Sequence, residues 1–256
     1  MRPELIAFER LLDIMDELRS KCPWDKKQTI ESLRYLTIEE TYELSDAIIE
    51  NNKSEVCKEL GDLMLHLVFY AKIASETGDF NITDVLNGIC EKLIVRHPHV
   101  FADTIVRNDE DVKNNWEKIK LKSGEKSVLA GVPKSLPAMV KAHRIQEKAR
   151  GVGFDWENSW QVWEKVIEEL NELKEEIKNK SELKRIEEEF GDLIFALINY
   201  GRFIGVNPED ALERTNKKFI KRFNYIECKA KEANRNLHDM TLKEMDVYWN
   251  EAKDYL

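Results

Sequence analysis

The sequence predicts an all-α protein made of two similar, tandem helical modules, and three observations support this fold class. The 256 residues are 42% hydrophobic and 35% charged, with only ten Gly and six Pro, which is typical of long helices. Strand-like alternation of polar and apolar residues is nearly absent. One acidic pattern, E-x-x-E followed by E-x-x-D, occurs twice, about 129 residues apart. We therefore expect two internally duplicated helical bundles in one chain.

The first half of the chain divides into four expected helices. They cover residues 3–19, 30–50, 55–77 and 84–96. A loop at Lys21–Asp25 ends the first helix, and Ser54 is expected to cap the third. Gly78 ends the third helix, and Thr83 is expected to cap the fourth, which stops at Arg96. This order places the two acidic motifs on consecutive helices.

The second half repeats this order, with expected helices over 159–178, 182–204 and 208–232. Matched without gaps, 38–48 and 167–177 share Ile, Glu, Glu, Glu, Leu and Ile at corresponding positions. Gly and Pro residues within 123–133 mark the boundary between the halves. The expected domains are 1–122 and 137–256, joined by a linker over 123–136.

Composition and charge exclude several classes of function. The net charge of −9, from 40 basic and 49 acidic residues, predicts no broad basic face for nucleic acid. The four cysteines stand singly without a C-x-x-C pair, so we exclude zinc-ribbon and redox motifs and expect reduced thiols. No apolar run approaches the ~18 residues of a membrane span, and the N-terminal helix has no signal-peptide core. We expect a cytoplasmic protein that binds neither nucleic acid nor membranes.

The duplicated acidic motifs form the candidate metal site. Residues three apart on a helix lie on one face, with Cβ atoms roughly 5–6 Å apart. If the two motif helices of a copy pack antiparallel, four carboxylates meet. The predicted ligands in the first copy are Glu40, Glu43, Glu59 and Asp62. The predicted ligands in the second copy are Glu169, Glu172, Glu189 and Asp192.

Carboxylates gathered in this way repel one another unless a cation neutralises them. Two unit charges 4 Å apart repel by about 4 kcal/mol at an effective dielectric constant near 20. Oxygen ligands favour hard cations, so we expect Mg²⁺, with Mn²⁺ as a substitute. We also expect these pockets to lack protein counter-charge. A single E-x-x-E is more often a solvated helix face, but its duplication beside apolar runs favours a retained site.

A cationic pair follows each acidic motif. Lys92 and Arg96 in the first copy lie at i, i+4 on one expected helical face. Lys218 and Arg222 repeat this spacing in the second copy, where Asn216 adds an amide donor. Lys supplies a point charge and Arg a planar fork, so each pair suits phosphate oxygens. Considered alone, such pairs are more often ordinary surface charges.

Two tryptophans are candidates for stacking on a nucleobase. Trp116 and Trp249 follow the two cationic pairs, and each precedes a lysine by four residues. Buried Trp is most often part of a core, but a base-stacking role stays open for these two. Other chemistry has less support, because the sequence contains no P-loop and no E-x-x-H motif, and Pro98 separates the two neighbouring histidines. Water is therefore the expected nucleophile.

Taken together, these residues resemble a known family, the MazG nucleoside triphosphate pyrophosphohydrolases, over nearly the whole chain. The segments that carry the resemblance are the duplicated acidic motifs, Cys22–Asp25, Arg96–Phe101 and Val152–Trp156. The resemblance implies an all-α fold and Mg²⁺-dependent cleavage of nucleoside triphosphates between the α and β phosphates, which yields monophosphate and pyrophosphate. It also implies broad base tolerance and a homodimer.

The resemblance further implies roles for individual residues. The eight acidic residues would be metal ligands, and the cationic pairs would meet the charge on the leaving pyrophosphate. The implied nucleotide-binding residues are Lys165, Arg185, Lys218, Arg222 and Trp249. Glu39 or Glu168 would accept the proton of the attacking water. We favour the second copy as the main site because Asn216 and Lys217 enrich its phosphate-facing turn.

Two alternative functions stay open. A narrower enzyme would keep the metals but act on inorganic pyrophosphate, dUTP or a phosphoribosyl nucleotide. A non-enzymatic helical regulatory protein would use its acidic faces for docking, and would neither bind Mg²⁺ nor turn over nucleotides.

Overall fold

The computed structural model describes residues 2–108, 112, 115 and 127–255, and these described residues contain helices and no strand. The all-α prediction is confirmed. The chain divides into two compact units, Met1–Val112 and Lys113–Leu256, which are named module 1 and module 2. The linker expected over 123–136 stays a prediction.

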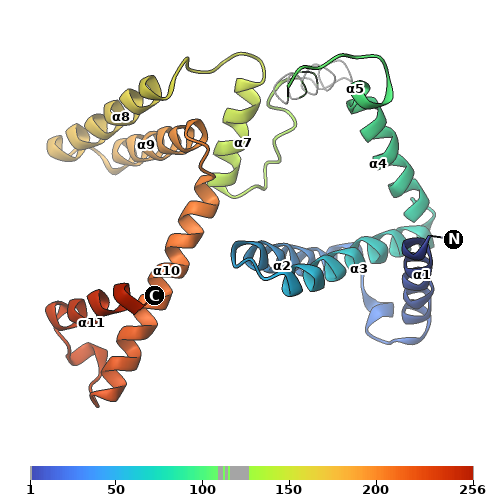
Figure 1. The fold of residues 1–256 in the computed structure, drawn as a ribbon, viewed down its shortest axis with the longest axis horizontal. Helices are drawn as coiled ribbons and strands as arrows, with labels where there is room; N and C mark the ends of the chain where they lie inside the picture. The colour runs from blue at the N-terminus through green and yellow to red at the C-terminus, as the bar shows by residue number, and fades with distance from the viewer. Residues whose placement is uncertain (1, 109–111, 113–114, 116–126, 256) are drawn as a thin grey trace. The chain divides into compact units, whose positions relative to one another are not determined.

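Module 1 contains a helical hairpin, α2 and α3, with a further helix packed on it (Figure 1). Its helices are α1 (Pro3–Lys21), α2 (Ile30–Ile49), α3 (Lys53–Thr77), α4 (Ile82–Arg96) and α5 (Pro98–Phe101), with a 3₁₀ turn at Asp25–Lys27. α2 lies along α3, and α1 packs against α3. The buried core residues of this module are Met15, Leu33, Val68 and Phe69.

Two helix starts in module 1 differ from the prediction. Asn52, not Ser54, caps α3, and its side-chain oxygen accepts a hydrogen bond from the Glu55 backbone N–H (3.3 Å). Asn81 caps α4 by accepting a hydrogen bond from the backbone N–H of Thr83 (2.7 Å), the residue predicted as the cap. In both cases an asparagine two residues upstream presents its oxygen to the unbonded amides of the first turn, so each helix begins earlier than predicted.

Module 2 repeats the hairpin with α8 and α9 (Figure 1). Its helices are α7 (Ala138–Arg150), α8 (Ser159–Asn179), α9 (Leu183–Phe203), α10 (Pro208–Glu232) and α11 (Leu242–Tyr255), with a 3₁₀ turn at Leu237–Asp239. α8 lies along α9, α7 contacts α9 and α10, and α11 packs on α10. The sequence-based prediction lacks α7 and α11. Thr241 and Glu244 form a capping box at the start of α11 (2.7 and 3.3 Å), which is the sequence signal for this helix.

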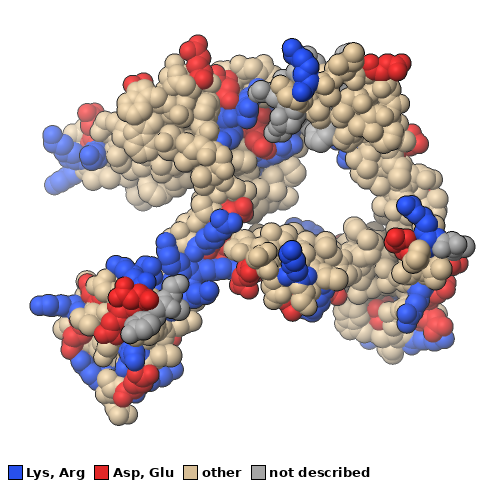
Figure 2. All heavy atoms as spheres, in the orientation of Figure 1, with Lys and Arg blue, Asp and Glu red and all other residues tan. Residues whose placement is uncertain are grey.

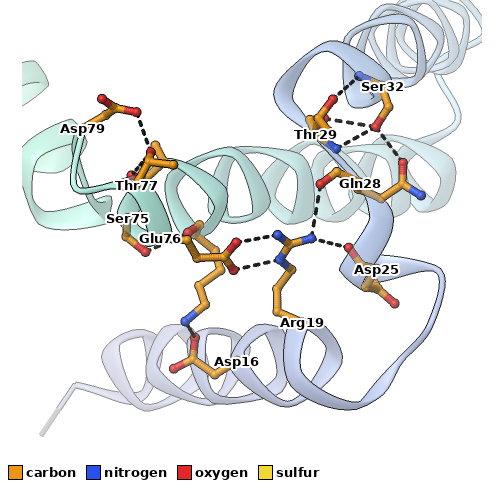
Figure 3. Close-up of polar contacts among 12 residues, drawn as sticks. Asp16, Arg19, Asp25, Gln28, Thr29, Ser32, Ser75, Glu76, Thr77 and Asp79 are labelled. Carbon is orange, nitrogen blue, oxygen red and sulfur yellow. Dashed lines mark hydrogen bonds and ion pairs between the residues drawn. The ribbon is translucent and has the colours of Figure 1, made fainter.

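An arginine holds the loop that precedes the first motif helix of each module. In module 1, Arg19 donates hydrogen bonds to the Glu76 carboxylate (2.9 and 2.5 Å) and lowers the pKa of Glu76 (Figure 3). The same guanidinium also donates to the backbone carbonyl of Asp25 in the loop. In module 2, Arg202 donates to both carboxylate oxygens of Asp155 in the corresponding loop. These contacts hold the loops that lead into α2 and α8, the helices that carry the E-x-x-E motifs.

The described structure has neither a disulfide nor a helix that could span a membrane. The four cysteines form no disulfide. Among the described helices, none combines the length and the apolarity needed to cross a bilayer.

Large apolar side chains are exposed along α4 and α10. On α4 they are Val85, Leu86, Ile89, Leu93, Ile94 and Val95, and on α10 they are Leu212, Phe219, Ile220 and Phe223.

Candidate metal and nucleotide site

The acidic motifs of module 1 converge on one group of carboxylates. Glu40 on α2 and both Glu59 and Asp62 on α3 offer oxygens that lie within 4.8 Å of one another. Glu59 is 3% exposed, and its Oε2 atom is buried without a hydrogen-bond partner. Glu43, the fourth predicted ligand, lies outside this group, although its charge acts on Glu40.

Module 2 gathers more acidic side chains than module 1. Glu169 forms one group with Glu168 and Glu172 on α8, with oxygens within 4.8 Å of one another. It forms a second such group with Glu189 and Asp192 on α9. Glu169 is 6% exposed. All four predicted ligands of the second copy, together with Glu168, therefore lie in one cluster around a buried carboxylate.

The hairpin geometry accounts for both clusters. α2 ends at Ile49 and α3 begins at Lys53, and so short a connection makes the two helices antiparallel neighbours. The E-x-x-E motif lies about as far before the turn as the E-x-x-D motif lies after it. Antiparallel packing therefore sets the motifs opposite one another, and the i, i+3 spacing directs the carboxylates of each motif to one face.

Burial and like charges perturb these carboxylates. Burial, followed by the charges of Asp62 and Glu43, raises the pKa of Glu40. Desolvation, followed by the charge of Glu169, raises the pKa of Glu172. Burial and the neighbouring charges both disfavour the ionised carboxylates, and a bound divalent cation would favour them.

A lysine reaches each cluster, so the expectation of pockets without protein counter-charge is wrong. In module 1, Lys58 Nζ lies 2.9 Å from Glu59 Oε1. In module 2, Lys165 Nζ lies 2.6 Å from Glu169 Oε1 and 2.7 Å from Glu168 Oε1. These contacts raise the pKa of both lysines. The flexible four-carbon stem of lysine allows the ammonium to reach from beside the motif, which motif spacing alone does not reveal.

The donor atoms fit a hard divalent cation. Each candidate ligand in the described groups is a carboxylate oxygen, and no described His or Cys joins them. One ammonium in each module leaves most of the carboxylate charge unneutralised. The buried, unpartnered Oε2 of Glu59 is a donor atom that still lacks a partner, and such an atom is costly unless something binds it. An all-oxygen set of this kind suits Mg²⁺ or Mn²⁺.

The cationic pair of module 2 lies beside an aromatic platform on α10 and α11. The Arg222 guanidinium lies 5.5 Å from the centroid of the Trp249 ring. The Phe219 ring lies against Trp249, with centroids 5.1 Å apart and planes at 56°. Figure 2 shows Lys and Arg side chains gathered along α10. Within the described chain, no ion pair or hydrogen bond joins Lys218 or Arg222 to the acidic cluster of α8 and α9.

Three further predicted residues of the site have other surroundings. Asn216 donates a hydrogen bond to Glu213 one turn earlier on α10 (3.2 Å). Arg185 pairs with Glu176 across the α8–α9 turn (3.2 Å) and is 60% exposed. Glu39 is exposed on α2. Glu39 therefore lies outside the groups of closely spaced carboxylates, and Asn216 and Arg185 pair with acidic residues that do not belong to those groups.

The counterpart residues of module 1 lie on α4. Lys92 and Arg96 have the predicted i, i+4 spacing on this helix, which ends at Arg96. Pro98 starts the separate short helix α5, as expected from its missing backbone N–H. Trp116, the predicted stacking residue of this copy, lies outside the described residues.

Two contacts of the site are missing from the sequence-based prediction. Phe219 lies between Lys218 and Arg222 in the chain, and its aromatic side chain within a cationic motif is the signal that could have identified it. Lys58 directly precedes Glu59, which is a weaker signal because Lys and Glu are common throughout this chain.

Comparison with known proteins identifies the domains that carry these clusters. The MazG nucleotide pyrophosphohydrolase domain matches the chain twice, at residues 28–101 and 159–226. The chain belongs to the MazG family. A protein of Thermotoga maritima named nucleoside triphosphate pyrophosphohydrolase/pyrophosphatase MazG is 45% identical over 258 residues, which cover 99% of this chain and 98% of that protein. The resemblance inferred from the sequence is confirmed.

Other MazG relatives extend the comparison. An Escherichia coli protein named nucleoside triphosphate pyrophosphohydrolase is 40% identical, covering 96% of this chain and 97% of that protein. The Bacillus subtilis protein YabN is 48% identical over 96% of this chain, which corresponds to 52% of YabN. The two MazG matches contain both acidic clusters and both cationic pairs. The second match ends before α11, so Trp249 lies beyond it.

Proposed function

We propose that this chain hydrolyses nucleoside triphosphates between the α and β phosphates, with Mg²⁺ as cofactor, Mn²⁺ as a substitute and broad tolerance of the base. The products would be a nucleoside monophosphate and pyrophosphate. The observation that carries the proposal is the convergence of carboxylate oxygens within 4.8 Å in each of two MazG domains. The names of the T. maritima and E. coli relatives, both nucleoside triphosphate pyrophosphohydrolases, support the same reaction class.

The carboxylates would divide into metal ligands and a proton acceptor. The ligands in module 2 would be Glu169, Glu172, Glu189 and Asp192, and those in module 1 would be Glu40, Glu59 and Asp62, with Glu43 beside them. When bound, Mg²⁺ supplies charge neutralisation to the triphosphate and holds it in place. Glu168, or Glu39 in module 1, neighbours the ligands and would accept the proton of the attacking water.

Cationic and aromatic side chains would bind the rest of the nucleotide. Lys218 and Arg222 would hold phosphate oxygens and meet the negative charge that develops on the leaving pyrophosphate. Lys165 and Arg185 would face the substrate from α8 and α9. Trp249 would stack on the base, and because every base offers a π-face, such a platform accounts for broad base tolerance.

A homodimer is part of the proposal. Large apolar side chains recur on the exposed faces of α4 and α10, and an exposed apolar patch often marks an interface. A second copy of the chain is the simplest symmetric occupant. Light scattering coupled to size-exclusion chromatography measures this directly, and a monomeric mass would contradict it. A cytoplasmic location, expected from cysteines that form no disulfide, belongs to the same proposal.

We infer that module 2 is the main catalytic site. Its cluster includes all four predicted ligands and Glu168, whereas the module 1 group includes three of its four predicted ligands. Module 2 also has the Arg222–Trp249 pair, with a cation and an aromatic face side by side. These features supply more of the groups that a triphosphate and its base require.

The proposal is tested by incubating the protein with a panel of ribo- and deoxyribonucleoside triphosphates and Mg²⁺, followed by ³¹P NMR of the products. Monophosphate and pyrophosphate from several bases are the expected result. Diphosphate and orthophosphate would contradict it. Turnover of dUTP or a phosphoribosyl nucleotide alone would favour a narrow enzyme, and orthophosphate from pyrophosphate would favour an inorganic pyrophosphatase. Absence of turnover and of any Mg²⁺ effect would favour a helical regulatory protein.

A further inference from the structure

The two modules bring a lysine to the buried carboxylate from different elements. In module 2, Lys165 lies one turn before Glu169 on α8 and contacts it at 2.6 Å. The corresponding position of module 1 is Leu36 on α2, so this cation is missing there. Module 1 instead uses Lys58 on α3, 2.9 Å from Glu59. The counter-charge therefore has a separate origin in each module.

The two lysines also differ in how firmly they are held. The Lys165 side chain is 36% exposed, and its ammonium lies between Glu168 and Glu169. The Lys58 side chain is 60% exposed, and its second partner, Glu55, is 3.7 Å away. Ion pairs strengthen as they are withdrawn from water, and exposed pairs contribute little. Lys165 is accordingly the stronger internal counter-ion.

We propose that Lys165 competes with the divalent cation for Glu169, and that it transfers to the triphosphate when the substrate binds. The inference rests on the proposed function of module 2. Glu169 is the acid shared by both carboxylate groups of this module, so the ammonium pairs with the carboxylate on which both groups depend. Phosphate oxygens brought beside these ligands offer Lys165 an alternative anionic partner.

The consequence is a difference in how the two modules bind metal. Without nucleotide, module 2 binds the cation weakly because the ammonium repels it and pairs with a ligand carboxylate. With a triphosphate present, Lys165 leaves Glu169 and the cation binds more tightly. Metal binding in module 1 depends less on the nucleotide, because Lys58 is more exposed and is held by fewer close contacts.

The test measures Mn²⁺ binding to the full-length chain from the EPR signal of the free ion. An Asp62→Asn background removes a ligand from module 1, so that the titration follows module 2. In this background, Lys165→Met should bind Mn²⁺ about three- to tenfold more tightly without nucleotide. A non-hydrolysable triphosphate analogue should then tighten Mn²⁺ binding by a smaller factor than it does in the parent chain.

Matched variants control for charge and folding. Lys178→Met removes the same charge from the exposed last turn of α8 and should leave the Mn²⁺ affinity unchanged. Lys165→Gln repeats the test with a neutral polar side chain, in case the Met variant unfolds. Lys58→Met in an Asp192→Asn background should increase the Mn²⁺ affinity of module 1 by less than about twofold, because the Lys58–Glu59 ion pair is more exposed.

The outcomes separate this inference from the proposed function. Unchanged or weaker Mn²⁺ binding in both Lys165 variants would overturn the inference and leave the proposed function standing. Absence of saturable Mn²⁺ binding in the parent chain would overturn both. Tighter binding in Lys178→Met as well as in Lys165→Met would show a general charge effect, which also overturns the inference.

Discussion

Module 1 and module 2 carry the same pair of acidic motifs on the same kind of helical hairpin, yet they surround the motifs differently. The oxygens of Glu40, Glu59 and Asp62 form a single group in module 1, whereas module 2 has two groups that share Glu169. Lysine counter-charge comes from α3 in module 1 and from α8 in module 2. The hairpin therefore ensures that carboxylates meet, while individual neighbouring side chains set the charge balance at each site.

The loops before α2 and α8 are both held by an arginine, but through different partner atoms. Arg19 holds the module 1 loop through a backbone carbonyl, and its carboxylate partner, Glu76, lies on α3. Arg202 holds the module 2 loop through the side chain of Asp155. A backbone contact tolerates any loop residue, whereas a side-chain contact requires Asp. The module 2 loop is thus the more sensitive of the two to substitution.

The largest difference between the modules is expected from removing one ligand in each. Glu172→Gln should lower kcat/KM for triphosphate hydrolysis by about 100-fold, because it removes a carboxylate from the main cluster. Glu43→Gln should have a much smaller effect, since Glu43 lies outside the module 1 group. Steady-state kinetics measures both. Glu175→Gln, on an exposed position of α8, is the control. Unchanged turnover in both ligand variants would contradict the site assignment.

Removing the Arg202–Asp155 contact, which holds the loop before α8, is expected to have the next largest effect. Arg202→Met removes the closer guanidinium partner of the Asp155 carboxylate, which is 19% exposed, and leaves the Arg150 guanidinium 3.7 Å away. Losing the close pair should lower the free energy of unfolding by about 2 kcal/mol. Urea unfolding measures the loss. Arg144→Met, which breaks the exposed Arg144–Glu147 pair, should cost less than about 0.5 kcal/mol. Equal losses of unfolding free energy in the two variants would show that the Arg202–Asp155 contact stabilises the protein no more than an exposed ion pair does.

The aromatic platform predicts a smaller, binding-specific effect. Phe219 contacts Trp249, and the corresponding residue of module 1 is Leu93. Phe219→Leu makes the platform of module 2 resemble module 1 and should raise KM about three- to fivefold through weaker base stacking. The value of kcat should stay near that of the parent. A fall in kcat with constant KM would contradict a role of Phe219 in binding the base.

The smallest expected effect is a pH dependence of Mg²⁺ stabilisation. The pKa values of Glu172 and Glu40 are raised above the ordinary 4.5. As pH rises from 4.5 through these raised values, the native state loses protons that the unfolded state has already lost, so metal-free stability falls. Mg²⁺ would bind the deprotonated groups, and its stabilising shift in Tm should therefore grow over this range. Scanning fluorimetry with and without Mg²⁺ measures the shift, and a shift that shrinks with rising pH would contradict the account.

The hairpins and their carboxylates could be predicted from the sequence because both depend on spacing. The i, i+3 motifs and the short turns at the ends of α2 and α8 determine which acidic residues can meet. The duplication within the chain supports the same prediction. Helix starts were less predictable, because Ser54 competes with Asn52 as a cap and only the structure shows which oxygen reaches the free amides.

The counter-ions and the platform could not be predicted in the same way. Lys165 is a predicted site residue, but its pairing with Glu169, like that of Lys58 with Glu59, depends on side-chain rotamers that spacing does not fix. The Phe219–Trp249 contact depends on how α11 packs on α10, a tertiary arrangement that local pattern does not encode. Those contacts required the structure.

The acidic cluster of each hairpin is expected to hold a divalent cation. Titration of the full-length chain with Mn²⁺, read by EPR and repeated on Asp62→Asn, Asp192→Asn and the double variant, tests this expectation. We expect saturable binding in the parent chain, partial loss in each single variant and complete loss in the double variant. Full Mn²⁺ binding that survives the double substitution, or no saturable binding in the parent, would contradict the account.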